Sequence, residues 1–142
     1  MEVRDILRRK GAIVETIAPE ATLHQACEQM AACRIGCLVV SNDGARVDGI
    51  LSERDIVTQV ALRGVGVLER FVNDALTRQV ITCAPGDDVV ELMSVMTDRR
   101  CRHLPVVDAG RLVGIVSIGD LVKARIDAAE TEAAALRDYI TS

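Results

Sequence analysis

The chain has 142 residues, 49% of them hydrophobic, and a formal net charge of −4. This length is typical of one compact domain with its own core, and the apolar content excludes a disordered chain. Phe71 and Tyr139 are the only aromatic residues. The composition therefore argues against a nucleic-acid-binding protein, because such surfaces are basic and stack bases on aromatic rings.

A membrane protein is not predicted either, since no run of about 18 apolar residues is present. The N-terminus is charged and lacks a signal-peptide pattern. The number of cysteines is odd, five, and no two of them form a CxxC pair. This argues against a disulfide framework and fits a reducing compartment. We expect a cytoplasmic protein.

The first elements along the chain are a strand and a capped helix. Residues 13–17 form a largely β-branched run that predicts a strand. Thr22 and Gln25 then have the spacing of a capping box, in which two side chains bond free N–H groups at the start of a helix. Apolar side chains recur at the helical period after that start, at Leu23, Ala26, Cys27 and Met30.

Two short strands and a second helix follow. The segments 37–40 and 47–51 are largely apolar and flank an Asn-Asp-Gly turn at residues 42–44, a pattern that predicts a β-hairpin. The second helix is predicted to begin at Ser52. The stretch 63–71, which has two glycines near its start, is interpreted as a linker.

The same series of elements recurs about 65 residues later in the chain. Ala-Pro at residues 18–19 returns at 84–85, and Gly-Ile-Leu-Ser at 49–52 returns as Gly-Ile-Val-Ser at 114–117. An internal repeat of this kind predicts one supersecondary unit built twice. The predicted elements of the second copy are a strand at 80–82, a helix capped by Asp88, strands at 104–107 and 111–116, and a helix from Ser117.

The last helix is predicted to run to the end of the chain, because no Gly or Pro interrupts residues 120–142. Its apolar residues have the spacing of a coiled-coil seam, at Val122, Ile126, Ala129, Ala133, Leu136 and Ile140. We expect this seam to contact another subunit. The alternative is that the helix folds back on its own module.

Three segments of the repeat resemble the signature of the cystathionine-β-synthase (CBS) domain. They are Gly-Ile-Leu-Ser-Glu-Arg-Asp at 49–55, Arg-His-Leu-Pro-Val-Val-Asp at 102–108 and Gly-Ile-Val-Ser-Ile-Gly-Asp at 114–120. The resemblance covers about residues 3–125 and implies an α+β fold of two βαββα CBS motifs related by a pseudo-twofold axis, plus an extended C-terminal helix. The expected divisions are CBS motif 1 (3–62), the linker (63–71), CBS motif 2 (72–126) and the helix extension (127–142).

By the same resemblance the chain is similar to stand-alone bacterial signal-transduction proteins of the Bateman-module type. Such modules bind an adenosine nucleotide (AMP, ADP, ATP or NAD) or S-adenosylmethionine in clefts between the motifs, and they pair as disc-shaped dimers. We therefore expect a homodimer through the CBS-module helices and the C-terminal helix. No cofactor is expected to be required. Because no effector domain is evident in the sequence, we expect the output to pass to a separate, unknown effector protein.

The Ser-x-x-Asp pairs of both copies have a chemistry suited to a ribose. Ser52 and Asp55, like Ser117 and Asp120, stand where a strand ends and a helix begins. A helix N-terminus attracts anions, a hydroxyl bonds ribose or phosphate oxygens, and a carboxylate accepts from both hydroxyls of a ribose. The alternative is an ordinary capping box with no ligand, and one arrangement can serve both purposes.

The resemblance implies that each cleft takes its base-lining strand from one motif and its aspartate from the other. One predicted cleft joins Asp55 to Val80, Ile81 and Thr82. The other joins Asp120 to Val14 and Thr16. The alternative for these five strand residues is that they are plain core.

Cations for a phosphate are predicted at Arg54, Arg100, Arg102 and His103. Pro105 lies in the same segment as Arg102 and His103. Where copy two has Arg102 and His103, copy one has Gly-Cys at 36–37. We therefore predict that the two clefts differ in affinity for a phosphate, with one tight cleft and one weak or empty.

Three other functions compete with that of a nucleotide sensor. An enzyme is not predicted, because the chain has no nucleophile elbow, P-loop or Gly-x-Gly-x-x-Gly and only two histidines, His24 and His103. A metal or redox sensor would need Cys33, Cys37, Cys101 and His103 to converge, since a Cys₃His set can hold zinc. The third alternative is a dimerisation scaffold with empty clefts.

Overall fold

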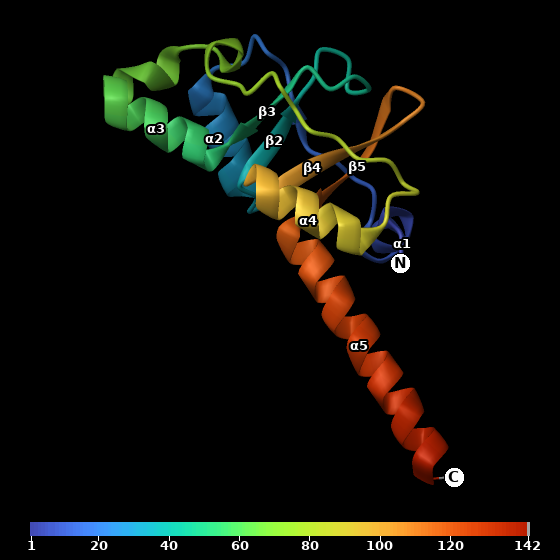
Figure 1. Cartoon of the computed structure of the whole chain (residues 1–142). Coiled ribbons are helices and arrows are strands. Elements are labelled where there is room, and N and C mark those ends of the chain that lie inside the picture. The colour runs from blue at the N-terminus through green and yellow to red at the C-terminus, as the bar shows by residue number, and fades with distance from the viewer. Residues whose placement is uncertain (142) are drawn as a thin grey trace.

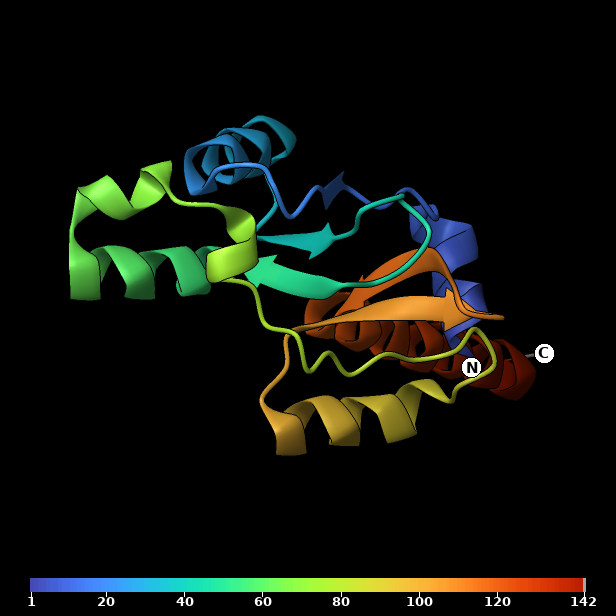
Figure 2. The same ribbon diagram turned by 90° about the horizontal axis from the view of Figure 1, so that it is seen from above.

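The computed structural model describes residues 1–141. Its elements in chain order, with 3-10 helices written η, are α1 (Val3–Lys10), β1 (Thr16–Ile17), α2 (Leu23–Cys33), β2 (Cys37–Val40), β3 (Gly49–Ser52), α3 (Glu53–Arg63), η1 (Val65–Glu69), η2 (Val72–Asp74), α4 (Val89–Arg99), β4 (His103–Asp108), β5 (Arg111–Ser117) and α5 (Ile118–Thr141). The predicted α+β class is confirmed, with two motifs and one long C-terminal helix (Figure 1). In the view from above, α2 and α4 lie on opposite sides of the strands (Figure 2).

In the first motif the predicted helix start and hairpin are confirmed. Thr22 is the N-cap of α2: its hydroxyl accepts from the Gln25 N–H at 3.1 Å, and its own N–H donates to Gln25 Oε1 at 2.9 Å. Strand β2 pairs parallel with β1 and antiparallel with β3, so the three strands form one sheet. The first strand is shorter than predicted, because regular pairing with β2 covers only Thr16 and Ile17 and Ile13 lies at the surface.

In the second motif the predicted strand at 80–82 is wrong. Strands β4 and β5 form a two-stranded antiparallel sheet, and the chain before α4 meets β4 only through an isolated bridge at Cys83. Pro105 gives the physical reason. Its counterpart in the first motif is Val39, whose N–H donates to the Glu15 carbonyl at 3.3 Å. A proline has no N–H, so this bond of the parallel ladder is missing.

Each motif is covered by the segment that precedes the other motif. Helix α1, which was not predicted from the sequence, packs Val3 and Ile6 into the core of the second motif. Conversely, Val72 of η2 is fully buried in the core of the first motif, beside Leu23 and Leu51. The two motifs are therefore interlocked, because neither core is complete without a segment from the other half of the repeat.

Two glycines allow this exchange of segments. A Cβ atom on Gly49 would meet Leu76 and would lie 2.8 Å from the Thr77 carbonyl oxygen. A Cβ atom on Gly114 would lie 2.7 Å from Leu7 Cδ2. Both positions are glycine because a neighbouring segment crosses β3 or β5 at very short range. The close approach that these glycines permit is thus to another part of the protein.

Helix α5 is continuous over 24 residues, which confirms the predicted C-terminal helix. Within its described length Leu121 and Ala124 are the buried residues, and beyond them the helix projects from the module (Figure 1). The alternative in which the helix folds back on its own module is therefore wrong. Three seam residues are exposed by 53%, 60% and 73%, namely Ile126, Leu136 and Ile140. Over residues 1–141, no helix is long and apolar enough to cross a membrane.

Candidate functional site

Both Ser-x-x-Asp pairs form complete capping boxes at a helix N-terminus. In the first, Ser52 Oγ accepts from the Asp55 N–H at 3.2 Å, and Asp55 Oδ2 accepts from the Ser52 N–H at 2.9 Å. In the second, the same two bonds between Ser117 and Asp120 measure 3.0 and 2.9 Å. The capping interpretation is therefore confirmed for both pairs. In the described part of the chain, Oδ1 of each aspartate accepts no hydrogen bond, so one oxygen of each box remains free for a ligand.

One cavity of about 420 Å³ gathers predicted site residues from both motifs. Val14 of the first motif lies in its wall with His103, Ser117 and Asp120 of the second. We call this space the Asp120 cavity. Its volume is within the usual range for a small-molecule site. Thr16, the other residue expected here, does not line it.

The segments expected to distinguish the two clefts meet in this one cavity. Gly36 and Cys37 of the first motif lie in the same wall as His103. Cys37 and His103 are the first residues of β2 and β4, so the starts of these two strands lie in one wall. The difference between the two copies at these positions therefore does not separate one cleft from the other.

Lys10 is a cation of the Asp120 cavity that sequence reasoning missed. Its ammonium group donates to Asp120 Oδ2 at 2.8 Å and to the Ile115 carbonyl oxygen at 3.0 Å. It is the last residue of α1, which packs against β5 and α5. The sequence carries no signal for this contact, because Lys10 and Asp120 are 110 residues apart. Arg34 is a second cation in the wall.

The charged groups of the Asp120 cavity act on one another. Burial acts to raise the pKa of Asp120, but hydrogen bonds from Lys10 and from the Ser117 N–H outweigh it, so the pKa is lowered. Burial lowers the pKa of His103; the Asp120 carboxylate opposes that shift, and the charges of Lys10 and Arg102 reinforce it. His103 is therefore a neutral imidazole at pH 7. A neutral imidazole can still donate or accept a hydrogen bond, and the role of His103 toward a phosphate stays a prediction.

The remaining predicted site residues lie outside this wall. They are Thr16, Ser52, Arg54, Asp55, Val80, Ile81, Thr82, Arg102 and Pro105. Ile81 packs against the core of the second motif, and Pro105 is buried in β4. Arg54 and Arg102 are exposed. Asp55 differs from Asp120 in having no basic partner within 4 Å among residues 1–141.

In the part of the chain that the structure describes, the four residues of the metal alternative do not all come together, although Cys37 and His103 line one cavity. Among the described residues, no group of three or more His, Cys, Asp or Glu side chains is placed to hold a metal ion. Burial, followed by the charge of Asp55, raises the pKa of the Cys37 thiol to about 12. A thiol of such high pKa is a poor metal ligand and a poor nucleophile at pH 7, since the thiolate is the reactive form.

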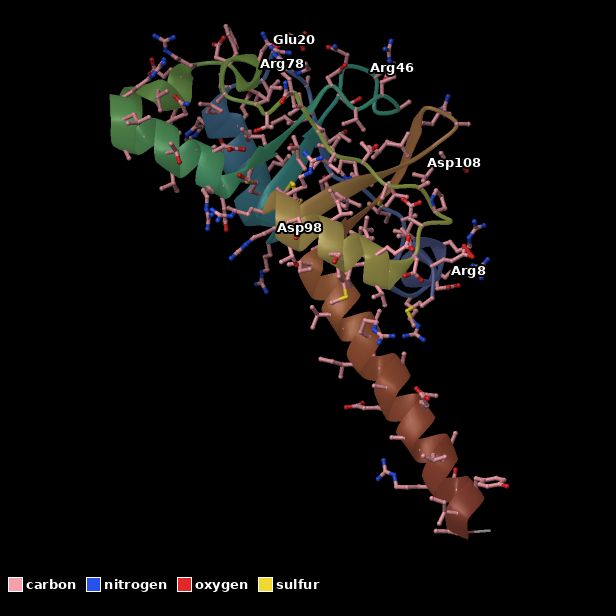
Figure 3. All side chains as sticks on the ribbon, in the orientation of Figure 1. Arg8, Glu20, Arg46, Arg78, Asp98 and Asp108 are labelled. Atoms are coloured by element: carbon pink, nitrogen blue, oxygen red, sulfur yellow. The ribbon has the colours of Figure 1, made fainter. Side chains whose placement is uncertain are left out.

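A second cavity, of about 380 Å³, opens at the edge of the first motif. Glu20 and Arg78 line it and lie close together at the upper edge of the molecule in Figure 3. The Arg78 guanidinium group already donates to Asn73 Oδ1 at 2.8 Å. None of the predicted site residues lines this cavity, so the Asp120 cavity is the candidate site.

Comparison with known proteins relates the chain to one family. The family model described as the CBS domain matches residues 3–62 and 72–127. The CBS domain-containing protein CBSX3, mitochondrial, of Arabidopsis thaliana is 31% identical over 146 residues, which cover 97% of this chain and 71% of that protein. Two longer Arabidopsis thaliana proteins, CBSCBSPB5 and CBSCBSPB4, are each 32% identical over 81% of this chain, which spans 21% of their length.

Solved structures share the tandem arrangement. The CBS-domain containing protein ATU1752 from Agrobacterium tumefaciens has a TM-score of 0.85 at 42% identity, over 88% of this chain and 99% of that one. The CBS domain pair of protein MJ0100, solved in complex with 5′-methylthioadenosine and S-adenosyl-L-methionine, has a TM-score of 0.77 at 24% identity, over 92% of this chain and 98% of that one. The similarity to MJ0100 is a similarity of fold alone.

Proposed function

We propose a function for this chain from one premise: the chain belongs to the CBS domain family and carries two copies of the domain. On that premise it is a regulatory module, and we infer that it binds an adenosine nucleotide between its two motifs and signals to another protein. The observation that carries the proposal is the Asp120 cavity, where a carboxylate at a helix N-terminus of one motif faces Val14 of the other.

The chemistry of the cavity suits the three parts of a nucleotide. The free Oδ1 of Asp120 can accept from a ribose hydroxyl while Oδ2 holds the helix cap. Apolar side chains in the same wall offer a slot for a purine, namely Ile13, Val14, Ile35 and Ile115. Lys10 and Arg34 supply positive charge. A CBS pair of the same fold, MJ0100, holds two adenosine compounds in its complex.

We propose that the two clefts bind with unequal affinity, the Asp120 cleft being the tighter. Asp120 lies in a lined cavity with two cations, whereas Asp55 has no basic partner among the described residues. The second, weaker cleft would join Asp55 to Val80, Ile81 and Thr82, with Arg54 at its rim. The unequal affinity no longer follows from the difference between Gly36-Cys37 and Arg102-His103, because Gly36, Cys37 and His103 line one cavity.

A thermal-shift panel followed by calorimetry tests the proposal. AMP, ADP, ATP, NAD and S-adenosylmethionine are each added to the intact chain. A ligand at 100 times its Kd stabilises the folded state by about 2.7 kcal/mol, which raises the melting temperature by several degrees. Asp120→Asn keeps an acceptor for the cap but loses the charge, and we expect it to weaken binding at least tenfold. Asp55→Asn is the matched variant of the other cleft. If no adenosine compound shifts the melt, the chain is a scaffold and the proposal fails.

We also propose that the protein is a homodimer that forms through the module helices and α5. Over its 24 residues α5 is about 36 Å long, and its seam is exposed where it leaves the module. The outer faces of α3 and α4 carry further exposed apolar side chains, at Val57, Leu62, Val90 and Val95. An unpaired apolar seam on a projecting helix is the pattern of a helix that packs on a partner.

Light scattering after size exclusion tests this assembly. We expect a dimer mass for the wild type at micromolar concentration. Replacing Ile126, Leu136 and Ile140 by Ser is expected to weaken the dimer at least tenfold, while Glu130→Ser with Glu132→Ser, on the same helix, should leave it intact. A monomeric wild type would contradict the proposal. A dimer that survives the seam variant would assign the contact to α3 and α4.

A further inference from the structure

The two equivalent aspartates of the repeat form the same helix cap but have different charged neighbours. Asp55 and Asp120 each accept the N–H of the serine three residues before, at 2.9 Å. Of these two aspartates, only Asp120 has a salt bridge among residues 1–141, to Lys10 at 2.8 Å. The pair is mostly shielded from solvent, since the two side chains are 33% and 26% exposed. The repeat has thus acquired a positive charge at one of its two equivalent positions.

Lys10 is held in place before any ligand arrives. Two of its three N–H donors are used, one by Asp120 and one by the Ile115 carbonyl oxygen, as described above. Arg9, its neighbour, lies 3.8 Å from Asp127 and adds a second link from α1 to α5. The third ammonium N–H of Lys10 has no acceptor among the described residues. A fixed donor loses little conformational entropy when it binds an anion.

The charge balance of the cavity depends on Lys10. Two cations, Lys10 and Arg34, face two carboxylates, Glu15 and Asp120, while His103 is neutral at pH 7. Without Lys10 the wall would carry an excess of one negative charge and would repel a phosphate. With Lys10, the charge of Asp120 is balanced locally, yet Oδ1 of that residue accepts no hydrogen bond from the described part of the chain.

We propose that Lys10 makes the Asp120 cavity selective for adenosine ligands that carry a phosphate, against uncharged adenosine and against the cationic sulfonium S-adenosylmethionine. This inference rests on the proposed function and narrows its ligand class. Asp120 bonds the ribose, which all three ligands share, and so contributes equally to each. The free N–H of Lys10 bonds the phosphate, which adenosine and the sulfonium lack. Lys10 is therefore the residue that determines specificity.

An NMR titration of the full chain tests this assignment at the cavity itself. The ring signal of His103 reports occupancy because His103 lies in the wall, and exposed His24 on α2 serves as an internal reference. AMP, adenosine and S-adenosylmethionine are titrated into the wild type and into Lys10→Met. Lys123→Met removes the same charge from the surface of α5 and is the matched control. Urea denaturation of each variant verifies that it is folded.

A single charge-assisted hydrogen bond corresponds to a change in affinity of about tenfold or more. We therefore expect the wild type to bind AMP at least tenfold more tightly than adenosine or S-adenosylmethionine. Lys10→Met should lose that preference because it binds AMP more weakly. Its affinity for adenosine should change by less than about threefold. Lys123→Met should retain the preference. In the wild type, added salt should weaken the binding of AMP and leave the binding of adenosine unchanged, because salt screens charge interactions. This last measurement needs no variant.

The contrary outcomes separate the two proposals. A wild type that binds adenosine as tightly as AMP at the His103 signal overturns the role of Lys10 and leaves the nucleotide site standing. Equal losses of AMP and adenosine in Lys10→Met overturn it as well, because they would mean that Lys10 merely positions Asp120. A wild type that binds none of the three ligands overturns both the proposed function and this inference.

Discussion

The two packing glycines make a sharp prediction, because their surroundings differ in one respect. At Gly114 the three atoms nearest to the added Cβ of Gly114→Ala all belong to the Leu7 side chain, the closest two at 2.7 and 2.8 Å. At Gly49 it meets Leu76 and also the Thr77 carbonyl oxygen, at 2.8 Å. A leucine side chain can change its rotamer, whereas a carbonyl oxygen held by backbone hydrogen bonds cannot move away.

The Thr77 backbone is held firmly. Its carbonyl accepts from the Ile50 N–H at 3.0 Å, and its N–H donates to the Ile50 carbonyl at 2.9 Å. Overpacking of this kind destabilises a protein by about 1–3 kcal/mol, and replacing Gly by Ala recovers about 0.4–1 kcal/mol through the unfolded chain. We expect Gly49→Ala to lower the free energy of unfolding by about 2 kcal/mol, and Gly114→Ala by less than about 1 kcal/mol.

Urea denaturation followed by far-UV circular dichroism measures the free energy of unfolding of both variants. The chain has no Trp, and Tyr139 is exposed on the projecting helix, so fluorescence would report poorly on the core. With an m-value near 2 kcal/mol/M, a loss of about 2 kcal/mol lowers the urea midpoint by about 1 M.

Double-mutant cycles give the decisive result. In a Leu7→Ala background the cost of Gly114→Ala should fall to within about 0.5 kcal/mol of zero, because the three atoms nearest to the added Cβ are gone. In a Leu76→Ala background Gly49→Ala should keep most of its cost, because the carbonyl of Thr77 remains. The reasoning is refuted if Gly114→Ala is as costly as Gly49→Ala, or if Leu76→Ala removes the cost at Gly49.

Three further predictions concern single side chains. The pKa of His103 is lowered in the folded state, so the unfolded chain binds more protons and stability should fall as the pH drops below about 6.5. His103→Gln should make the urea midpoint less dependent on pH between pH 5.5 and 7. A variant with the pH dependence of the wild type would contradict this. Cys33 is exposed whereas burial raises the pKa of Cys37 to about 12, so iodoacetamide followed by mass spectrometry should label Cys33 first, and equal rates would argue against the buried thiol. Thr22→Ala removes the cap of α2 and should lower the free energy of unfolding by about 1 kcal/mol, whereas Thr22→Ser should stay close to wild type in the same denaturation assay.

Much of the local structure was accessible from the sequence, since it depends on residues close together in the chain. The capping box at Thr22 joins groups three residues apart, and the boxes at Ser52 and Ser117 do the same. The continuity of α5 follows from the absence of Gly and Pro over its length. The predicted strand at 80–82 failed because β-branched residues favour a strand while its partner position holds a proline that cannot complete the pairing.

The candidate site was accessible only in part. The positions of Ser117, Asp120, Val14 and His103 around one cavity agree with residues chosen from the sequence. Lys10 was not chosen, because α1 covers the second motif although it precedes the first. Nor was it foreseeable that the glycines at 49 and 114 are required by crossing protein segments.

The amino-acid sequence alone therefore determines the repeat, its capped helices and the class of chemistry at each helix start, because these depend on short spacings and on side-chain type. The tertiary structure determines which half of the repeat completes which core, and hence why Asp120 has a lysine and Asp55 has none. The physical reason is that such contacts join residues as much as 110 positions apart, whose proximity depends on how the whole chain packs.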